Sequence, residues 1–322
     1  MDETQSNLWS AASLARPIGS LAADNSHSLA YEQKFGNVRK MKKEGLNIED
    51  FTDPELKGFE ASGAAPLPSP TESGYVAHEG AQIWYGSFGA GPAVLLLHGG
   101  LGHSGNWGYQ IPALLENGYR TILIDTRGHG RSTRDTRPYS YELLASDVLA
   151  VMNHLDIKKA ATVGWSDGAC TSLVLAKTAS ARVAGVFYFA CNMNPGGAKD
   201  PFDSSPLLDR CFSRHVKDYA ELSPTPDQFT ALVKDLGPMQ RTQPDYSAHD
   251  LAAITVPVVI AQAEQDEFIK REHAEYLARS IPNARYQFLP GVSHFAPLQK
   301  PSQFNIAILS FVSDLVSRGD LD

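Results

Sequence analysis

The chain has 322 residues, of which 43% are hydrophobic, and carries a formal net charge of −8 at pH 7. A chain of this length and composition can bury a core without disulfide or metal staples. Its acidic balance argues against binding nucleic acid or anionic membranes and is compatible with small neutral or cationic ligands. No apolar run approaches transmembrane length, and the acidic N-terminus does not resemble a secretory signal, so we expect a cytoplasmic protein.

Residues 1–73 differ from the rest and are interpreted as an N-terminal extension and linker. They are polar, carry a basic cluster at residues 39–43, and end in a Pro-rich stretch at residues 64–70. Residues 28–59 could hold one or two short helices. We see no chemistry in this part and expect a surface extension or an arm of a homo-oligomer.

A regular pattern begins at residue 74. Residues 75–78 and 82–88 flank a Glu79-Gly80 turn, which predicts a β-hairpin. The uninterrupted apolar run at residues 93–98 is typical of a buried parallel strand, and a further strand is predicted at residues 121–125.

Strands and helices then alternate along the chain. The predicted elements are a helix at 141–157, a strand at 160–163, a helix from 169, a strand at 183–190, a strand at 256–261, a helix at 271–280, a strand at 285–289 and a helix at 302–318. Repeated strand–helix units predict an α/β fold with a mostly parallel sheet and helices on both faces.

The alternation stops between about residues 192 and 253. This stretch is rich in Pro, Asp and Ser and shows short helical pieces, such as residues 227–236. We interpret residues 193–250 as a cap over the carboxyl edge of the sheet. The core then consists of residues 74–192 and 251–322.

The strongest motif is the G-x-S-x-G pentapeptide at residues 164–168, between a predicted strand and a predicted helix. Strand, sharp turn and helix form the context of a nucleophile elbow, in which Ser166 projects above the sheet. A serine nucleophile needs a base that is oriented by an acid.

In this architecture the chain order must be Ser, acid, His. Asp266 and His294 each follow a predicted strand, so both lie at the carboxyl edge where ligands bind. We therefore expect a triad of Ser166, His294 and Asp266, with Glu264 and Glu267 as alternatives for the acid.

An acyl-transfer site also needs donors for the oxyanion. We predict the amide of Asp167 and the amide of Gly100, with Leu101 as the second choice for the latter. His98 is expected to be structural, and the glycine-rich loop at residues 125–132 to be a turn rather than a phosphate cradle.

Metal and disulfide chemistry are not indicated. The three cysteines, Cys170, Cys191 and Cys211, are widely spaced without a C-x-x-C motif, and no H-E-x-x-H occurs. Cys170 and Cys191 are expected in the core.

Together these motifs resemble the α/β-hydrolase superfamily. The matching residues are His98-Gly99-Gly100, Asp125-x-Arg127-Gly128-x-Gly130-x-Ser132, residues 164–168, Asp266 and His294. Within it the chain resembles capped esterases, and residues 164–168 are similar to valacyclovir-hydrolase-like enzymes. The resemblance implies an eight-stranded sheet, a cap after the sixth strand, no cofactor, and catalysis by Ser166, His294 and Asp266.

Several positions depart from relatives in this superfamily. Ala263 replaces a frequent Gly three residues before the acid, and Leu101-Gly102 replaces the Pro-Gly of proline iminopeptidases. Ser166 stands where haloalkane dehalogenases and epoxide hydrolases carry Asp.

These features favour a serine esterase that hydrolyses a small carboxylic ester, lactone or thioester through an acyl-enzyme. Alternatives are a ligand receptor with negligible turnover, or a cofactor-free perhydrolase or C–C bond hydrolase. Leu101, Trp165 and Phe295 are expected to line the substrate pocket, although core packing is an equal interpretation for Trp165. The carboxylate of Asp167 either favours a cationic substrate, as the family resemblance suggests, or turns away to pair with backbone or an arginine.

Overall fold

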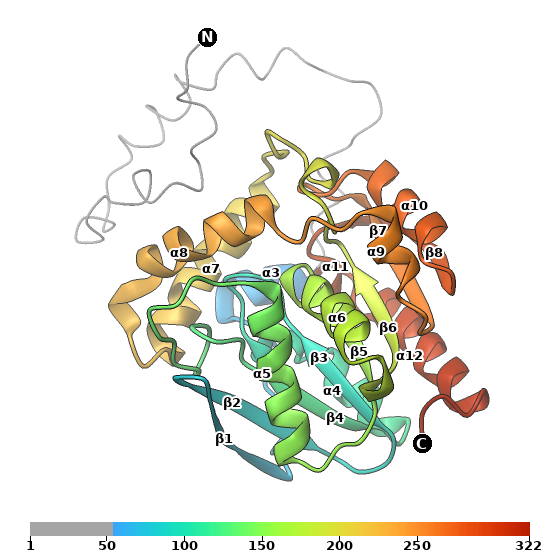
Figure 1. The fold of residues 1–322 in the computed structure, drawn as a ribbon. Helices are drawn as coiled ribbons and strands as arrows, with labels where there is room; N and C mark the ends of the chain where they lie inside the picture. Colours follow the sequence, from blue (N-terminus) through green and yellow to red (C-terminus); the bar gives the residue numbers. More distant parts are fainter. Residues whose placement is uncertain (1–53) are drawn as a thin grey trace.

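The eight-stranded sheet that the resemblance implied is present in the computed structural model, which describes residues 54–322 (Figure 1). Its strand order is β1-β2-β4-β3-β5-β6-β7-β8, and β3 to β8 run parallel while β1 and β2 are antiparallel to their neighbours. The strands are β1 (Glu72–His78), β2 (Ala81–Phe88), β3 (Ala93–Leu97), β4 (Arg120–Ile124), β5 (Ala160–Trp165), β6 (Val183–Phe189), β7 (Val258–Gln265) and β8 (Ala284–Ser293).

The β1–β2 turn and the burial of the central strands agree with the local sequence. Glu79 and Gly80 both adopt positive φ angles, of 42° and 81°, which match the two-residue turn that a tight hairpin requires. Every residue of β3, β5 and β6 is buried, as expected for apolar runs in the middle of a parallel sheet.

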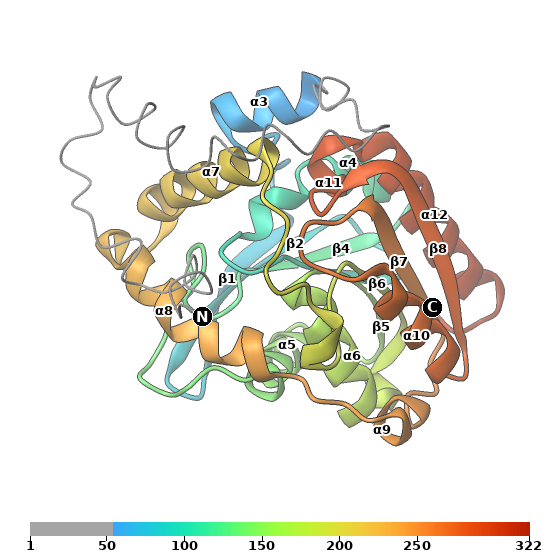
Figure 2. The ribbon, with the colours of Figure 1, turned by 90° about the horizontal axis from the view of Figure 1, so that it is seen from above.

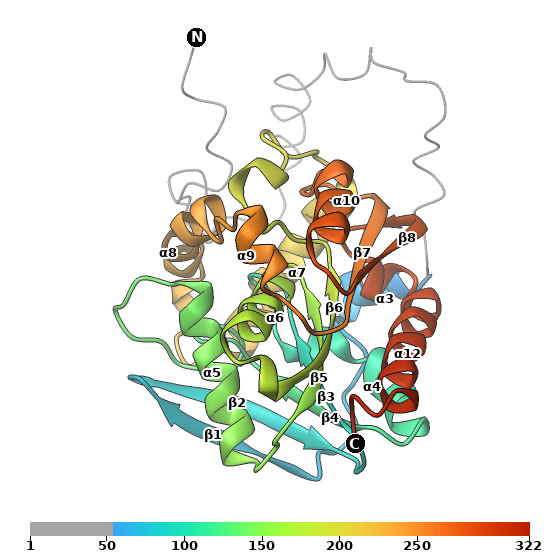
Figure 3. The ribbon, with the colours of Figure 1, turned by 45° about the vertical axis from the view of Figure 1, so that its right-hand side comes forward.

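Helices cover both faces of the sheet, and each face has its own apolar cluster (Figure 3). On one face lie α5 (Tyr141–His154), α6 (Asp167–Thr178) and α10 (Arg271–Ser280). On the other lie α4 (Gln110–Glu116) and α12 (Pro301–Ser317), where Phe304 packs against Phe187 and Phe189. The predicted two-sided α/β architecture is confirmed. None of the helices in residues 54–322 is both long and apolar enough to cross a membrane.

The stretch between β6 and β7, residues 190–257, is called the insertion below. It contains α7 (Pro206–Leu222), α8 (Phe229–Thr242) and α9 (Ala248–Ala252), and α7 and α8 are longer than the short pieces expected. The Ser and Pro that suggested loops start a helix instead, because Ser205 caps α7 and Pro206 occupies its first turn. Likewise α8 continues through Pro238 rather than ending at Leu236. Figure 2 shows α7 and α8 approaching each other at the end where they are joined and diverging from there.

Part of the predicted N-terminal extension also packs on the insertion. Helix α3 (Pro54–Ser62) contacts α7 and α11 (Ala296–Gln299). Phe59 is fully buried, and its ring meets that of His215 edge-on with centroids 6.2 Å apart. The basic cluster at residues 39–43 and the rest of residues 1–53 lie outside the described residues.

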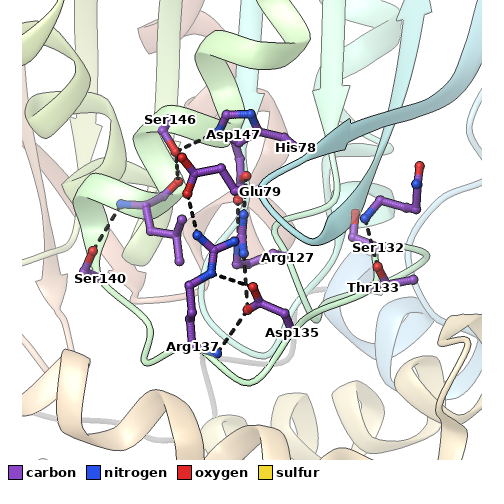
Figure 4. Close-up of polar contacts among 12 residues, drawn as sticks. His78, Glu79, Arg127, Ser132, Thr133, Asp135, Arg137, Ser140, Ser146 and Asp147 are labelled. Atoms are coloured by element: carbon purple, nitrogen blue, oxygen red, sulfur yellow. Dashed lines mark hydrogen bonds and ion pairs between the residues drawn. The ribbon is translucent and has the colours of Figure 1, made fainter.

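A buried ion pair anchors the loop that joins β4 to α5 (Figure 4). Arg127, which is 1% exposed, donates from Nε and Nη2 to both carboxylate oxygens of Asp147 on α5, each at 2.7 Å. Asp135 lies 3.6 Å from Arg127 and also binds Arg137, which reaches Glu79 in the β1–β2 turn. The network joins the hairpin, the loop and α5.

Asp147→Ala should therefore lower the free energy of unfolding by about 3–5 kcal/mol, because it removes both short hydrogen bonds of the buried Arg127 guanidinium and leaves only the more distant Asp135 carboxylate. Asp135→Ala, which removes a more exposed partner, should lower it by less than about 1 kcal/mol. Urea unfolding of both variants provides the comparison. Equal effects of the two substitutions would contradict this account of the network.

Candidate active site

Ser166 occupies a strained turn between β5 and α6. Its φ and ψ are 54° and −122°, a conformation that a side chain disfavours. A Cβ at Gly168 would collide with the carbonyl oxygen of Leu97, and a Cβ at Gly164 with the carbonyl oxygen of Gly168. The two glycines of the motif therefore let α6 approach β3 and β5 closely enough to hold the serine in this turn.

His294 and Asp266 meet at the ends of β8 and β7. The imidazole Nδ1 of His294 lies 3.1 Å and 3.3 Å from the two carboxylate oxygens of Asp266, and both residues are buried. The backbone amides of Phe268 and Ile269 donate to Asp266 Oδ1, each at 2.9 Å. These bonds fix the carboxylate in place, and the carboxylate in turn fixes the orientation of the imidazole.

The other two acids considered from the sequence are placed differently. Glu264 is exposed and accepts the Gly291 amide at 2.7 Å. Glu267 is buried and accepts the backbone amide of His294 at 3.0 Å. Of these three carboxylates, Asp266 is the one that contacts the imidazole ring.

The electrostatic environment favours a protonated His294. Burial alone would lower the pKa of its imidazole, but the charge and hydrogen bond of Asp266, together with Glu267 and Asp167, raise this pKa above its ordinary value. A base placed in this way is stabilised when it accepts a proton.

Ser166 and His294 border one cavity of about 470 Å³, which also has walls from the insertion. The residues predicted to line a pocket, Leu101, Trp165 and Phe295, all border it. Residues of α7 and α8 that complete the walls include Leu208, Phe212, His215 and Gln240. A mostly apolar cavity with a few polar groups is typical of a small-molecule site.

Trp165 fulfils both interpretations offered for it. Its ring lies edge-on to Phe295 at 5.9 Å and to Trp107 at 6.1 Å, which is core packing. It also borders the cavity and lies 6.3 Å from the ring of His294. The indole therefore supports the imidazole as well as forming the pocket floor.

The predicted oxyanion donors border the same cavity. Asp167 is the first residue of α6, where a helix has no internal acceptor for its amide. Gly100 and Leu101 lie in a turn closed by a 3.2 Å hydrogen bond from the Gly102 amide to the Gly99 carbonyl, and Leu101 has a φ of 65°. Both residues border the cavity.

The carboxylate of Asp167 pairs with neutral donors rather than with backbone or an arginine. Tyr141 donates its hydroxyl to Oδ1 at 2.7 Å, and Gln240 of α8 donates its amide to Oδ2 at 2.9 Å. Burial, assisted by the Asp167 charge, raises the pKa of Tyr141 well above its ordinary value, so this hydroxyl remains a donor. No sequence motif marked Tyr141 or Gln240.

His98 and the loop at residues 125–132 have the structural roles expected of them. His98 Nε2 accepts the Thr126 amide at 3.0 Å, and burial lowers the pKa of the imidazole to about 4. The Asp125 carboxylate accepts the amides of Ser104 and Arg131 at 2.8 and 2.9 Å. Because a buried carboxylate fills this turn, it would repel a phosphate.

Cysteines and metal ligands add no further site in the part of the chain that the structure describes. Cys170, Cys191 and Cys211 are buried and form no disulfide. Within residues 54–322, no three His, Cys, Asp or Glu side chains are grouped to hold a metal ion.

Comparison with known proteins agrees with the fold. Residues 92–195 match the family described as alpha/beta hydrolase fold. A non-heme haloperoxidase of Rhodococcus erythropolis is 27% identical over 269 residues, which cover 73% of this chain and 97% of that protein. The serine hydrolase BPHL of Homo sapiens is 27% identical over 260 residues, or 76% of this chain and 88% of the relative.

A solved structure leads to the same conclusion. A meta-cleavage product hydrolase from Pseudomonas fluorescens IP01 has a TM-score of 0.65 at 21% identity, covering 75% of this chain and 97% of that one. The names of these three proteins cover several reactions, so they agree on the fold and not on a substrate.

Asp266→Asn should reduce kcat by about 10⁴-fold if the carboxylate holds His294 in its working tautomer. Glu264→Gln, near the end of β7 but hydrogen-bonded to the Gly291 amide, is the matched control and should leave kcat within about twofold. Steady-state rates with an activated ester measure both. A larger loss in Glu264→Gln than in Asp266→Asn would show that the acid is misassigned.

Proposed function

We propose that this chain, which belongs to the α/β-hydrolase superfamily, is a serine hydrolase that cleaves a small carboxylic ester, lactone or thioester. One observation carries the proposal. Ser166, strained at the start of α6, borders the same cavity as His294, whose Nδ1 is hydrogen-bonded to Asp266.

The residues divide the work as follows. Ser166 Oγ attacks the substrate carbonyl carbon while His294 Nε2 takes the hydroxyl proton, and Asp266 stabilises the imidazolium. The amides of Asp167 and of Gly100 or Leu101 stabilise the oxyanion. His294 then gives the proton to the departing alcohol or thiol, and an acyl-enzyme remains on Ser166. Water, deprotonated by His294, releases the acid and restores the serine.

The insertion is proposed to act as a cap over this site. Its α7 and α8 supply Leu208, Phe212 and Gln240 to the cavity, which the core lines with Leu101, Trp165 and Phe295. The apolar side chains favour the apolar atoms of the acyl or alcohol group in the part of the cavity that they line. Substitutions in α7 and α8 should thus alter substrate preference.

Ser166→Ala should reduce the hydrolysis of every accepted ester in a panel of esters, lactones and thioesters to the background rate, because the nucleophile is lost. Ser172→Ala is the control, since Ser172 is buried on the same helix but bonds to the Gly168 carbonyl at 2.8 Å. It should keep nearly full activity. Residual turnover in Ser166→Ala would count against acylation, and no turnover by the wild type would favour a receptor.

The carboxylate of Asp167 is proposed to favour substrates with a cationic group. It borders the cavity and has two neutral donors, Tyr141 and Gln240, so its negative charge is not balanced by these hydrogen bonds. An ammonium group on the acyl or alcohol part would supply the balancing charge.

Asp167→Asn should reduce the preference for a cationic ester over a neutral ester of the same size by about tenfold, equivalent to about 1.4 kcal/mol. The measurement is the ratio of the two kcat/KM values in wild type and variant. The neutral ester is the internal control, because changes in folding or nucleophile geometry affect both substrates. An unchanged ratio would show that the Asp167 carboxylate plays no part in substrate recognition.

A further inference from the structure

Glu267, the residue after the proposed catalytic acid, makes two hydrogen bonds that connect separate parts of the molecule. Its Oε2 accepts the backbone amide of His294 at 3.0 Å. Its Oε1 accepts the hydroxyl of Ser205 at 2.9 Å. The side chain is only 4% exposed, so both oxygens depend on protein donors rather than on water.

Ser205 belongs to the insertion and begins its first long helix. Its Oγ accepts the Leu208 amide at 3.0 Å and thereby caps α7, while the same hydroxyl donates to Glu267. Helix α7 carries Leu208, Phe212 and His215 into the cavity. One carboxylate thus contacts the start of a cavity-lining helix and the backbone of His294.

Backbone contacts reinforce this connection. Ala198 and Ile269 form an antiparallel bridge, and the Lys199 amide donates to the Phe268 carbonyl at 2.7 Å. The Asp203 amide donates to the carbonyl of Glu267 itself at 2.8 Å. The start of the insertion therefore runs along the loop that holds both Asp266 and Glu267.

We propose that Glu267 is a positioning residue that couples the seating of α7 to the placement of His294. This inference rests on the proposed function, in which His294 is the base. A substrate that holds α7 in its observed position preserves the hydrogen bond between Ser205 and Glu267. His294 then keeps its position relative to Ser166. Displacement of α7 removes a donor from a buried carboxylate, which then holds the His294 backbone less firmly.

Charge provides a separate signature of this contact. The carboxylates that face the imidazole of His294 are Asp266 and Glu267 from the loop after β7 and Asp167 from α6. The nearby Lys199 donates from Nζ to the Asp203 carboxylate and to the backbone carbonyl of Asp266, each at 2.6 Å. Because Glu267 contributes to the raised pKa of His294, neutralising it should lower that pKa.

The first test uses Glu267→Gln, which keeps a carbonyl acceptor for the His294 amide but removes the charge. The acid limb of kcat/KM should move to lower pH by about half to one unit, while kcat at the optimum stays within about threefold. NMR titration of the His294 ring should show the same shift. Glu264→Gln, which removes an exposed carboxylate near the end of β7, is the charge-matched control and should leave the acid limb of kcat/KM at the wild-type pH.

The second test separates coupling from simple support. Glu267→Ala should reduce kcat by about 10- to 100-fold, because His294 loses its anchor. Ser205→Ala, which removes the donor that joins the start of α7 to Glu267, should raise KM by about three- to tenfold and lower kcat by less than Glu267→Ala does. Restoration of kcat in Glu267→Gln relative to Glu267→Ala supports positioning through the acceptor oxygen.

Two results would overturn the proposal. One is an unchanged His294 titration in Glu267→Gln together with full activity in Glu267→Ala, and the other is a Ser205→Ala variant with unaltered KM. The NMR titration needs no turnover, so it tests Glu267 even if the wild type hydrolyses none of the esters. Failure of the proposed function and failure of this inference are therefore distinguishable.

Discussion

The site depends on one backbone constraint, the left-handed conformation of Ser166 at the junction of β5 and α6. The turn brings the amide end of α6 and the serine hydroxyl to the edge where β7 and β8 deliver Asp266 and His294. It persists because α6 packs closely on β3 and β5, which is possible only with glycine at positions 164 and 168. A relaxed turn would displace both the Ser166 hydroxyl and the Asp167 amide. The proposed nucleophile and one proposed oxyanion donor would then be lost together.

Around this constraint the protein collects buried carboxylates, each with a different set of partners. Asp266 accepts backbone amides and faces the imidazole, Glu267 faces the His294 backbone, and Asp167 faces Tyr141 and Gln240. Their combined charge raises the pKa of His294 despite its burial. In the proposed mechanism this charge stabilises the imidazolium that forms as Ser166 attacks. Glu267 also accepts from Ser205, which caps α7, and Asp167 accepts from Gln240 of α8, so the insertion and the electrostatics of the site are linked.

The part of this architecture that is readable from sequence is the part encoded locally. The strands and the positions of Ser166, Asp266 and His294 follow from apolar runs, one short motif and the rule that functional residues follow parallel strands. Helix α7 was missed because Ser205 and Pro206, which cap and start it, are also turn formers. Tyr141 and Gln240 were not foreseen, because their contact with Asp167 joins elements far apart in the chain. For the same reason, Glu267 was considered only as an alternative acid.

The central claim is that Ser166 forms a covalent acyl-enzyme, and mass spectrometry tests it most directly. The protein is mixed with an activated ester, quenched in acid within the first turnovers and digested. The account predicts a mass increase equal to the acyl group on the peptide that carries Ser166, and its disappearance on longer incubation as water releases the acid. Ester turnover without this adduct, or an adduct on another residue, would contradict the account.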